Sequence, residues 1–258
     1  MRTLLTGIFI IFCTLAARAE VQLVPFQFGD QNKTDIPTVF WPAAKSKATL
    51  IFLPGGRGSF GITNKADPKP SWVLEKIYSQ ADGQLNLVFM DSHFSLQGDF
   101  GDPYTRWSPR REAAHLESIK TAVKYYKEKF GQPVILFGHS NGTLSIAEFL
   151  NRDPNNSKAV AGVILSGSRN ETELQQPLAI PILVLHHKTD SNQWTSPAHA
   201  EALYQSIRSI NASVTELKWV EGGSDTGGDP THTGKHMYHE ATSEAADGII
   251  SFAQRVLK

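Results

Sequence analysis

The sequence predicts an α/β fold, in which a mostly parallel, twisted sheet of about eight strands carries helices on both faces. Two observations indicate this class. Short apolar runs alternate along the chain with longer amphipathic segments, as strands alternate with helices in such folds. Most of the short runs are continuously apolar, which is typical of parallel strands that are covered on both sides.

The expected strands fall into two groups. The parallel group comprises the continuously apolar runs 48–53, 85–91, 134–137, 160–165, 181–186 and 214–220. The segments 21–28 and 38–41 come first in the chain, and we expect them to add antiparallel strands at one edge of the sheet.

The clearest expected helix covers 111–130. Its apolar residues recur at steps of three and four and form one stripe: Leu116, Ile119, Val123, Tyr126 and Phe130. Gly131 follows as a typical C-terminal stop. Further helices are expected over 72–80, 142–152, 197–210 and 243–257, and the stretch 151–156, rich in Asn, Asp and Pro, is expected to be a loop.

Residues 1–19 have the pattern of a secretory signal peptide: a basic start, a short apolar run, and a small-x-small ending at Ala17-Arg18-Ala19. The apolar run is shorter than the roughly 20 residues that span a bilayer, which disfavours a retained anchor. Cleavage after Ala19 would leave a single domain, 20–258. The only cysteine, Cys13, lies in the signal, so the mature chain forms no disulfide. A secreted or periplasmic bacterial protein fits this pattern best.

The charge balance bears on the partners of the protein. The chain carries 25 basic and 25 acidic residues, and removal of the signal takes away Arg2 and Arg18. A nearly neutral chain argues against an electrostatic grip on nucleic acid or on a membrane surface after signal cleavage. We therefore expect a small-molecule partner; the sequence leaves the oligomeric state open.

A motif with catalytic meaning stands at Gly138-His139-Ser140-Asn141-Gly142. The apolar run 134–137 leads into it and a helical pattern follows, which is the context that a G-x-S-x-G nucleophile elbow requires. The glycines allow a sharp, crowded turn that exposes the serine hydroxyl near a helix N-terminus. Ser140 is therefore the candidate nucleophile; the alternative is a serine that only caps the helix.

A serine nucleophile needs a base and an acid that orients the base, and in this kind of sheet they follow in the order Ser, Asp or Glu, His. Asp190 comes just after the run 181–186, at the sheet edge where ligands bind. Glu171 and Glu173 compete with it but lie deeper in a polar loop. In the alternative interpretation, Asp190 is a solvated loop residue that caps the next helix.

Three histidines of the loop before the last helix are candidate bases: His232, His236 and His239. We favour His236, because it lies late enough in the loop to fold back over the sheet and early enough to stay clear of the helix. The alternative interpretation of each histidine is an ordinary residue on the protein surface.

The oxyanion hole needs two backbone N–H donors. Asn141, directly after the nucleophile, is expected to supply one. The glycine-rich stretch Pro54-Gly55-Gly56-Arg57-Gly58 follows a strand, and we expect Gly56 to supply the other, with Gly55 or Arg57 as alternatives. The stretch lacks the features of a nucleotide-binding loop, so no cofactor is expected.

These residues resemble the α/β-hydrolase superfamily over nearly the whole mature chain, most closely its small, secreted bacterial members without a lid. The resemblance implies a serine hydrolase with esterase-like activity and the triad Ser140, Asp190 and His236. The resemblance is weakest around the base. Members of the superfamily often have a glycine next to this histidine, whereas this chain has Lys235-His236-Met237. The short stretch between 165 and 181 leaves no room for an inserted lid, so we expect an open, shallow site.

Three alternatives belong to other classes. A metal-dependent hydrolase would use His232, His236 and His239 with His186 and His187, but no H-E-x-x-H motif is present and the loop is unsuited to a regular helix. A non-catalytic binding protein could use the same scaffold. A peptidase of this fold usually carries an additional gating domain, for which the chain has no length.

Overall fold

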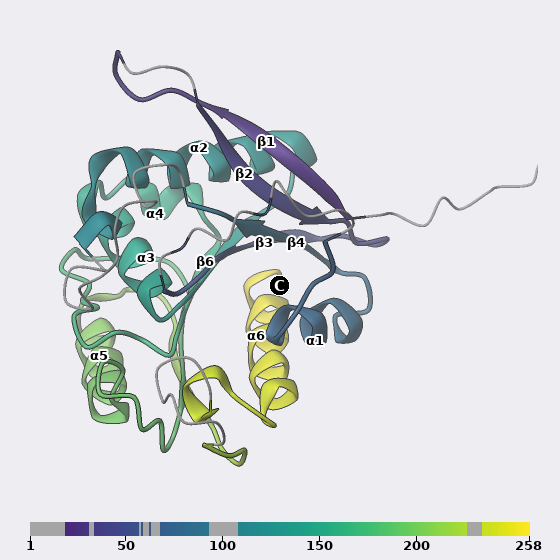
Figure 1. Ribbon diagram of the computed structural model, residues 1–258. Helices are drawn as coiled ribbons and strands as arrows, with labels where there is room; N and C mark the ends of the chain where they lie inside the picture. Colours follow the sequence, from purple (N-terminus) through teal and green to yellow (C-terminus); the bar gives the residue numbers. More distant parts are fainter. Residues whose placement is uncertain are drawn as a thin grey trace, which may run out of the picture.

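The computed structural model describes residues 19–30, 34–56, 58, 62, 68–92, 108–225 and 234–258. One eight-stranded sheet runs through them in the order β1-β2-β4-β3-β5-β6-β7-β8 (Figure 1). The strands are β1 Glu20–Phe26, β2 Thr34–Trp41, β3 Ala48–Leu53, β4 Leu85–Met90, β5 Val134–His139, β6 Gly162–Ser166, β7 Ile182–His187 and β8 Thr215–Val220.

The strand directions divide the sheet as the sequence predicts. β1 pairs with β2, and β2 with β4, in antiparallel fashion, whereas every neighbouring pair from β4 through β3 to β8 is parallel. The residues of β3, β5, β6 and β7 are all buried, because helices cover both faces.

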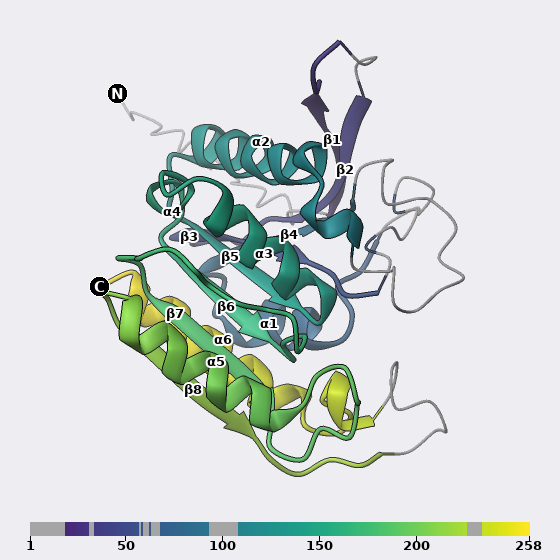
Figure 2. The same ribbon diagram turned by 90° about the vertical axis from the view of Figure 1, so that its left-hand side faces the viewer.

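The helices form two layers around the sheet. They are α1 Val73–Gln80, α2 Ala113–Phe130, α3 Asn141–Arg152, the short α4 Asn156–Ala159, α5 Pro197–Ile210 and α6 Thr242–Val256. The apolar side chains of α2, α3 and α5 pack in one core and those of α1 and α6 in the other. Figure 2 shows the same arrangement, with α5 in front of the sheet and α6 behind it.

Helix α2 illustrates how the sequence pattern becomes packing. Leu116, Ile119, Val123 and Tyr126 from the predicted stripe are buried against the sheet. Gly131 ends the helix in the left-handed conformation, with φ of 63°, and its N–H donates to the carbonyl of Lys127. The C-terminal stop predicted from the glycine is confirmed.

Two segments differ from the expected elements. β2 begins at Thr34 rather than at residue 38 and includes Pro37. Only its last part, from Thr38, pairs with β4. Pro37 has no N–H to donate, and it is tolerated because it precedes the part of β2 that pairs with β4. The loop expected over 151–156 is shorter in the structure, because α3 continues to Arg152 and the helical turn α4 begins at Asn156.

The topology brings several loops together at one edge of the sheet. β3 and β5 are adjacent and in register, with Leu53 opposite Gly138, so the segments that follow them leave the sheet side by side. β7 runs parallel to these strands, so the segment that follows it leaves the sheet at the same edge. This is the edge where ligands bind in open α/β sheets.

The β6–β7 connection, 167–181, contains no helix, in agreement with the absence of a large lid. Among the helices that the structure describes, none has the length and apolar character needed to cross a membrane.

Candidate active site

Ser140 lies on the sharp turn between β5 and α3, with φ of 53° and ψ of −122°. A Cβ atom at Gly138 would lie 2.5 Å from the carbonyl oxygen of Gly142, and one at Gly142 would collide with the carbonyl oxygen of Leu53. Both glycines are therefore required for the turn. The turn holds the partly exposed Ser140 above the sheet in a conformation that L-residues rarely adopt.

Asp190 is buried in the loop that follows β7. Its Oδ1 accepts a hydrogen bond from the backbone N–H of Asn192 at 2.9 Å, and its Oδ2 accepts one from the hydroxyl of Thr195, also at 2.9 Å. The carboxylate is thus fixed by its own loop before it meets any histidine.

His236 lies in a short 3-10 helix, Gly234–Met237, and its ring is buried. Its Nδ1 is 2.9 Å from Oδ2 of Asp190, so the opposite ring nitrogen, Nε2, is left for another partner. Of the two rival histidines, His239 is exposed and lies near Glu240, while His232 falls outside the described residues. The structure thus joins Asp190 to the histidine that we favour.

The two competing acids lie elsewhere. Glu171 forms a two-point ion pair with Arg169, at 3.0 and 3.1 Å, and Glu173 is exposed. Neither forms a hydrogen bond with His236.

The expected oxyanion donors border the same space. Within the described part of the chain, the backbone N–H groups of Gly56 and Asn141 donate no hydrogen bond. A Cβ at Gly55 would lie 2.9 Å from the Cβ of Ser140, so this loop passes directly beside the serine. Arg57, the other alternative, lies outside the described residues.

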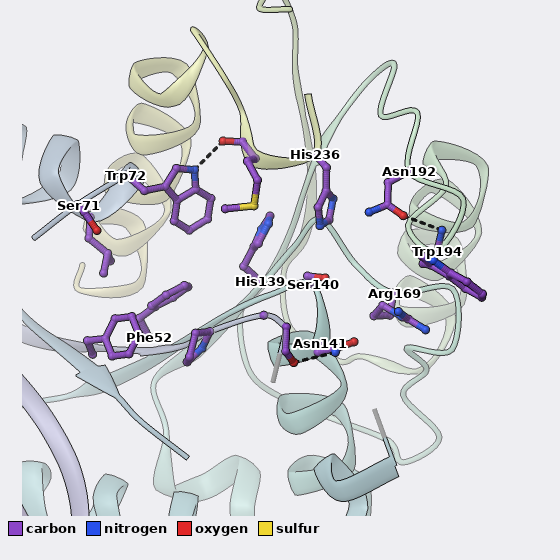
Figure 3. Close-up of a pocket in the computed structure, with 16 residues that line it drawn as sticks. Phe52, Ser71, Trp72, His139, Ser140, Asn141, Arg169, Asn192, Trp194 and His236 are labelled. Atoms are coloured by element: carbon purple, nitrogen blue, oxygen red, sulfur yellow. Dashed lines mark hydrogen bonds between the residues drawn. The ribbon is translucent and has the colours of Figure 1, made fainter. Parts of the chain in front are cut away.

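Ser140, His236 and the residues of the two expected oxyanion donors line one cavity of about 320 Å³, which Figure 3 shows with the His236 ring above Ser140. Asp190 contacts His236 but does not line the cavity. Described residues that line the cavity are Phe52, Pro54, Gly55, Gly56, Ser71, Trp72, Leu74, Phe89, His139, Ser140, Asn141, Arg169, Asn192, Trp194, His236 and Met237. The candidate nucleophile, the candidate base and the residues of the two expected oxyanion donors thus border a common space.

Comparison with solved structures finds the same architecture in hydrolases. The dienelactone hydrolase of Anabaena variabilis is similar at a TM-score of 0.61 and 13% identity, over 92% of this chain and 98% of that one. An esterase of Pyrococcus furiosus is similar at 0.60 and 12%, over 93% of both. An α/β serine hydrolase without a lid from Xanthomonas campestris is similar at 0.58 and 12%, over 92% and 94%.

The chain has the α/β-hydrolase fold. No model of a protein family matches the sequence, and no curated protein sequence matches it either. The likeness therefore lies in the arrangement of the elements, and the chemistry has to be argued from the residues at the site.

Arg110 lies next to the candidate site, and the sequence does not single it out. It lies in the 3-10 helix Ser108–Arg111 and is fully buried. Its Nη2 donates to three successive carbonyl oxygens of residues 54–56, which follow β3 and which we call the oxyanion loop after their expected role. The acceptors are Pro54 at 2.9 Å, Gly55 at 3.3 Å and Gly56 at 3.1 Å.

A second group supports the same loop, because the side-chain Nδ2 of Asn141 donates to the carbonyl of Gly56 at 2.9 Å. These bonds turn the loop carbonyls towards Arg110 and Asn141. Burial lowers the pKa of Arg110 to about 9, against the opposing effect of Asp91, so its guanidinium remains charged at neutral pH.

The charge state of the acid follows from its contacts. Burial would raise the pKa of Asp190, but hydrogen bonds with His186 and His236 outweigh burial and hold the pKa well below its ordinary value. Asp190 is therefore an anion at neutral pH, as the partner of a catalytic histidine must be.

His139, the second residue of the elbow, lies beside the base. Its ring centre is 4.8 Å from that of His236, and its Nδ1 is 3.1 Å from the hydroxyl of Ser166. Burial, together with the nearby His236, lowers the pKa of His139 well below its usual value. A neutral His139 places no positive charge against His236. Gly167 makes room for both rings, since a Cβ there would lie 2.7 Å from Cε1 of His139.

Of the residues that the metal-dependent alternative would use, His232 falls outside the described residues. Among the described residues, no group of three or more His, Cys, Asp or Glu side chains is placed to hold a metal ion. His186 and His187 bind the carbonyls of Thr195 and Gly222, respectively.

Proposed function

We propose that this protein is a secreted serine hydrolase that cleaves carboxylic esters through Ser140, His236 and Asp190. The observation that carries the proposal is the 2.9 Å pair of His236 and Asp190 at the cavity that also receives the strained Ser140. A serine on such a turn is a weak nucleophile until a positioned base takes its proton.

In the proposed reaction, Nε2 of His236 takes the proton of the Ser140 hydroxyl as Oγ attacks the ester carbonyl carbon. The N–H groups of Gly56 and Asn141 bind the negative oxygen that forms. The bond to the alcohol then breaks, and His236 returns its proton to the leaving oxygen. Water, activated by the same histidine, releases the acyl group from Ser140.

An ester is favoured over other acyl compounds by the cavity and by the fold neighbours. Apolar side chains form much of the cavity wall, and the volume is at the lower end of the range for small-molecule sites, roughly 300–1,000 Å³. An esterase and a dienelactone hydrolase are among the proteins with the same fold. A small ester-type molecule is therefore the proposed substrate.

Secretion to the periplasm or the exterior belongs to the same proposal. It rests on the signal-like pattern of residues 1–19 and on the lack of cysteine after Cys13. β1 begins at Glu20, so cleavage after Ala19 would leave every strand of the sheet intact.

The test uses the purified mature chain, a fluorophosphonate probe and a panel of p-nitrophenyl esters. We expect the probe to label the protein, and we expect Ser140→Ala to lose labelling and several orders of magnitude in kcat. Ser209→Ala, an exposed serine on α5, is the matched control and should behave as the original chain does.

Full esterase activity in Ser140→Ala would refute the proposal. A folded original chain that the probe does not label would instead favour a non-catalytic binding protein. Loss of activity with a strong chelator, without loss of labelling, would favour the metal-dependent alternative.

A further inference from the structure

Trp72 has an unusual backbone conformation for a bulky residue. It precedes helix α1 with φ of 56° and ψ of −139°, in the same sparsely populated region as Ser140. Glycine adopts this region freely, whereas a large side chain is an outlier there. Surrounding contacts must therefore hold Trp72 in place.

Those contacts are extensive and lie at the active site. The indole Nε1 donates to the carbonyl of Met237, the residue after the proposed base, at 2.6 Å. The ring stacks on Tyr238 with an interplanar angle of 3°, and its centre lies 4.7 Å from that of His139 and 5.8 Å from that of Phe52. The indole is thus fixed by a hydrogen bond and by rings on several sides.

The fixed indole forms one wall of the cavity. Figure 3 places Trp72, Phe52 and Ser71 on one side of Ser140, and Arg169 and Trp194 on the other. Leu74, Phe89 and Met237 also line the cavity. We call Phe52, Trp72, Leu74, Phe89 and Met237 the apolar wall; it contains no charged side chain, whereas the opposite side carries Arg169.

The volume limits what the apolar wall can receive. An apolar cavity of about 150 Å³ is large enough to hold benzene. The cavity lined by the described residues is about 320 Å³ and must also receive the reacting ester group. The remaining space therefore suits one ring or a short chain.

We propose that Trp72 is a specificity-determining residue, which closes the apolar wall and limits the group bound there to a short aliphatic chain or a single ring. The inference rests on the proposed esterase function and deepens it. That apolar group is either the acyl or the alcohol portion of the ester, and the two arms of the experiment separate these sources.

The experiment measures kcat and KM for two series of esters. One series varies the acyl chain of p-nitrophenyl esters from acetate to dodecanoate, and the other varies the alcohol of acetate esters from methanol to octanol and benzyl alcohol. The variants are Trp72→Ala, Trp72→Gly and Trp72→Phe. Trp72→Gly opens the wall and also suits the positive φ, so it provides a folded variant even if Trp72→Ala does not fold.

We expect the original chain to lose kcat/KM beyond a short chain in one series. Trp72→Ala and Trp72→Gly should raise kcat/KM for the long members of that series, relative to the short ones, by about tenfold or more, mainly through KM. Trp72→Phe keeps a ring but loses the bond to Met237, and should give a smaller shift. The series that shifts identifies the portion of the ester bound at the wall.

Trp41→Phe is the matched control. The Trp41 indole is buried and also donates to a backbone carbonyl, that of Pro68 at 2.9 Å, but Trp41 does not line the cavity. Its length profile should equal that of the original chain. The inference is overturned if Trp72→Gly keeps the original profile in both series while the fluorophosphonate probe still labels it, or if Trp41→Phe shifts the profile equally. Failure of the proposed function is a different result, namely activity that survives Ser140→Ala.

Discussion

Asp190 and His236 are separated by 46 positions in the chain, yet Oδ2 of Asp190 lies 2.9 Å from Nδ1 of His236. Asn192 and Thr195 hold the carboxylate, and the Thr195 hydroxyl also lies 3.1 Å from Nδ1 of His236, so one residue contacts both members of the pair. The pair therefore needs no substrate in order to form. A preorganised acid–histidine pair is what a base for serine activation requires.

At the scale of the single residue, Asp190→Asn should lower kcat by about 10⁴-fold. The amide has nearly the same shape but can present an N–H to Nδ1 of His236, which favours the wrong tautomer and stabilises no imidazolium. Kinetics with the best p-nitrophenyl ester measure the effect. Glu173→Gln, the exposed competing acid, should leave kcat unchanged. Equal rates for Asp190→Asn and the original chain would remove Asp190 from the mechanism.

At the scale of the element, the oxyanion loop is held from behind by two other segments. The carbonyls of Pro54, Gly55 and Gly56 bind Arg110, and α3 contributes the side chain of Asn141 to Gly56. With the carbonyls occupied, the N–H groups of the loop are left for a substrate. We expect this buried guanidinium to support the proposed catalysis without lining the cavity itself.

Arg110→Lys tests this positioning role. Lysine keeps the charge, but its single nitrogen cannot reproduce both the Nη2 bonds to the three carbonyls and the Nη1 bond to Ser145 at 3.1 Å. We expect kcat to fall by up to about 10²-fold with a smaller change in KM, since the loss of one oxyanion donor costs about 10²–10³-fold. The free energy of unfolding should fall by about 1–3 kcal/mol, measured with urea, because buried carbonyls lose partners.

Arg208→Lys, on the exposed face of α5, serves as the control and should change neither quantity. If Arg110→Lys lowers stability while kcat stays at the original value, the arginine has a structural role alone.

At the scale of the whole molecule, the sequence predicts the elements well for a physical reason. Strands buried on both faces must be apolar throughout, and α2 must show an apolar stripe, so both leave a local pattern. The elbow at Ser140 also leaves a local pattern, because its glycines stand at a fixed spacing around the serine. Gly138 is required by Gly142 within the motif, whereas Gly142 is required by Leu53 of the neighbouring strand β3. These features do not depend on knowing the rest of the fold.

Long-range contacts leave no such pattern. Arg110 binds Gly56 across 54 positions, and nothing in its neighbouring sequence distinguishes it from other arginines. The choice of His236 over His239 likewise depends on where the loop meets Asp190. The conformation of Trp72 has no local signal, since tryptophan is not a residue expected at positive φ. The catalytic roles of these residues remain predictions until the variants are measured.

The buried histidine of the elbow ties stability to pH for the molecule as a whole. His139 has a folded-state pKa well below its ordinary value of 6.5, chiefly through burial and also through His236. Below about pH 6.5 the unfolded chain therefore binds a proton that the folded chain refuses, and stability falls as pH falls. Asp190 acts in the same direction at lower pH, where protonation of the unfolded carboxylate begins near its ordinary value of 3.8.

We therefore expect the free energy of unfolding, measured with urea, to decrease from pH 7 to pH 5, with up to about 1.4 kcal/mol per pH unit arising from His139. His139→Gln removes this group, so its profile over the same range should be flatter than that of the original chain even if the variant is less stable overall. His239→Gln, at an exposed position, should keep the original slope. The original chain and His139→Gln differ in this one titrating group, so the difference between their slopes reports His139 together with its electrostatic effect on neighbours such as His236. Equal slopes in these two proteins would mean that His139 takes up its proton as readily in the folded as in the unfolded chain.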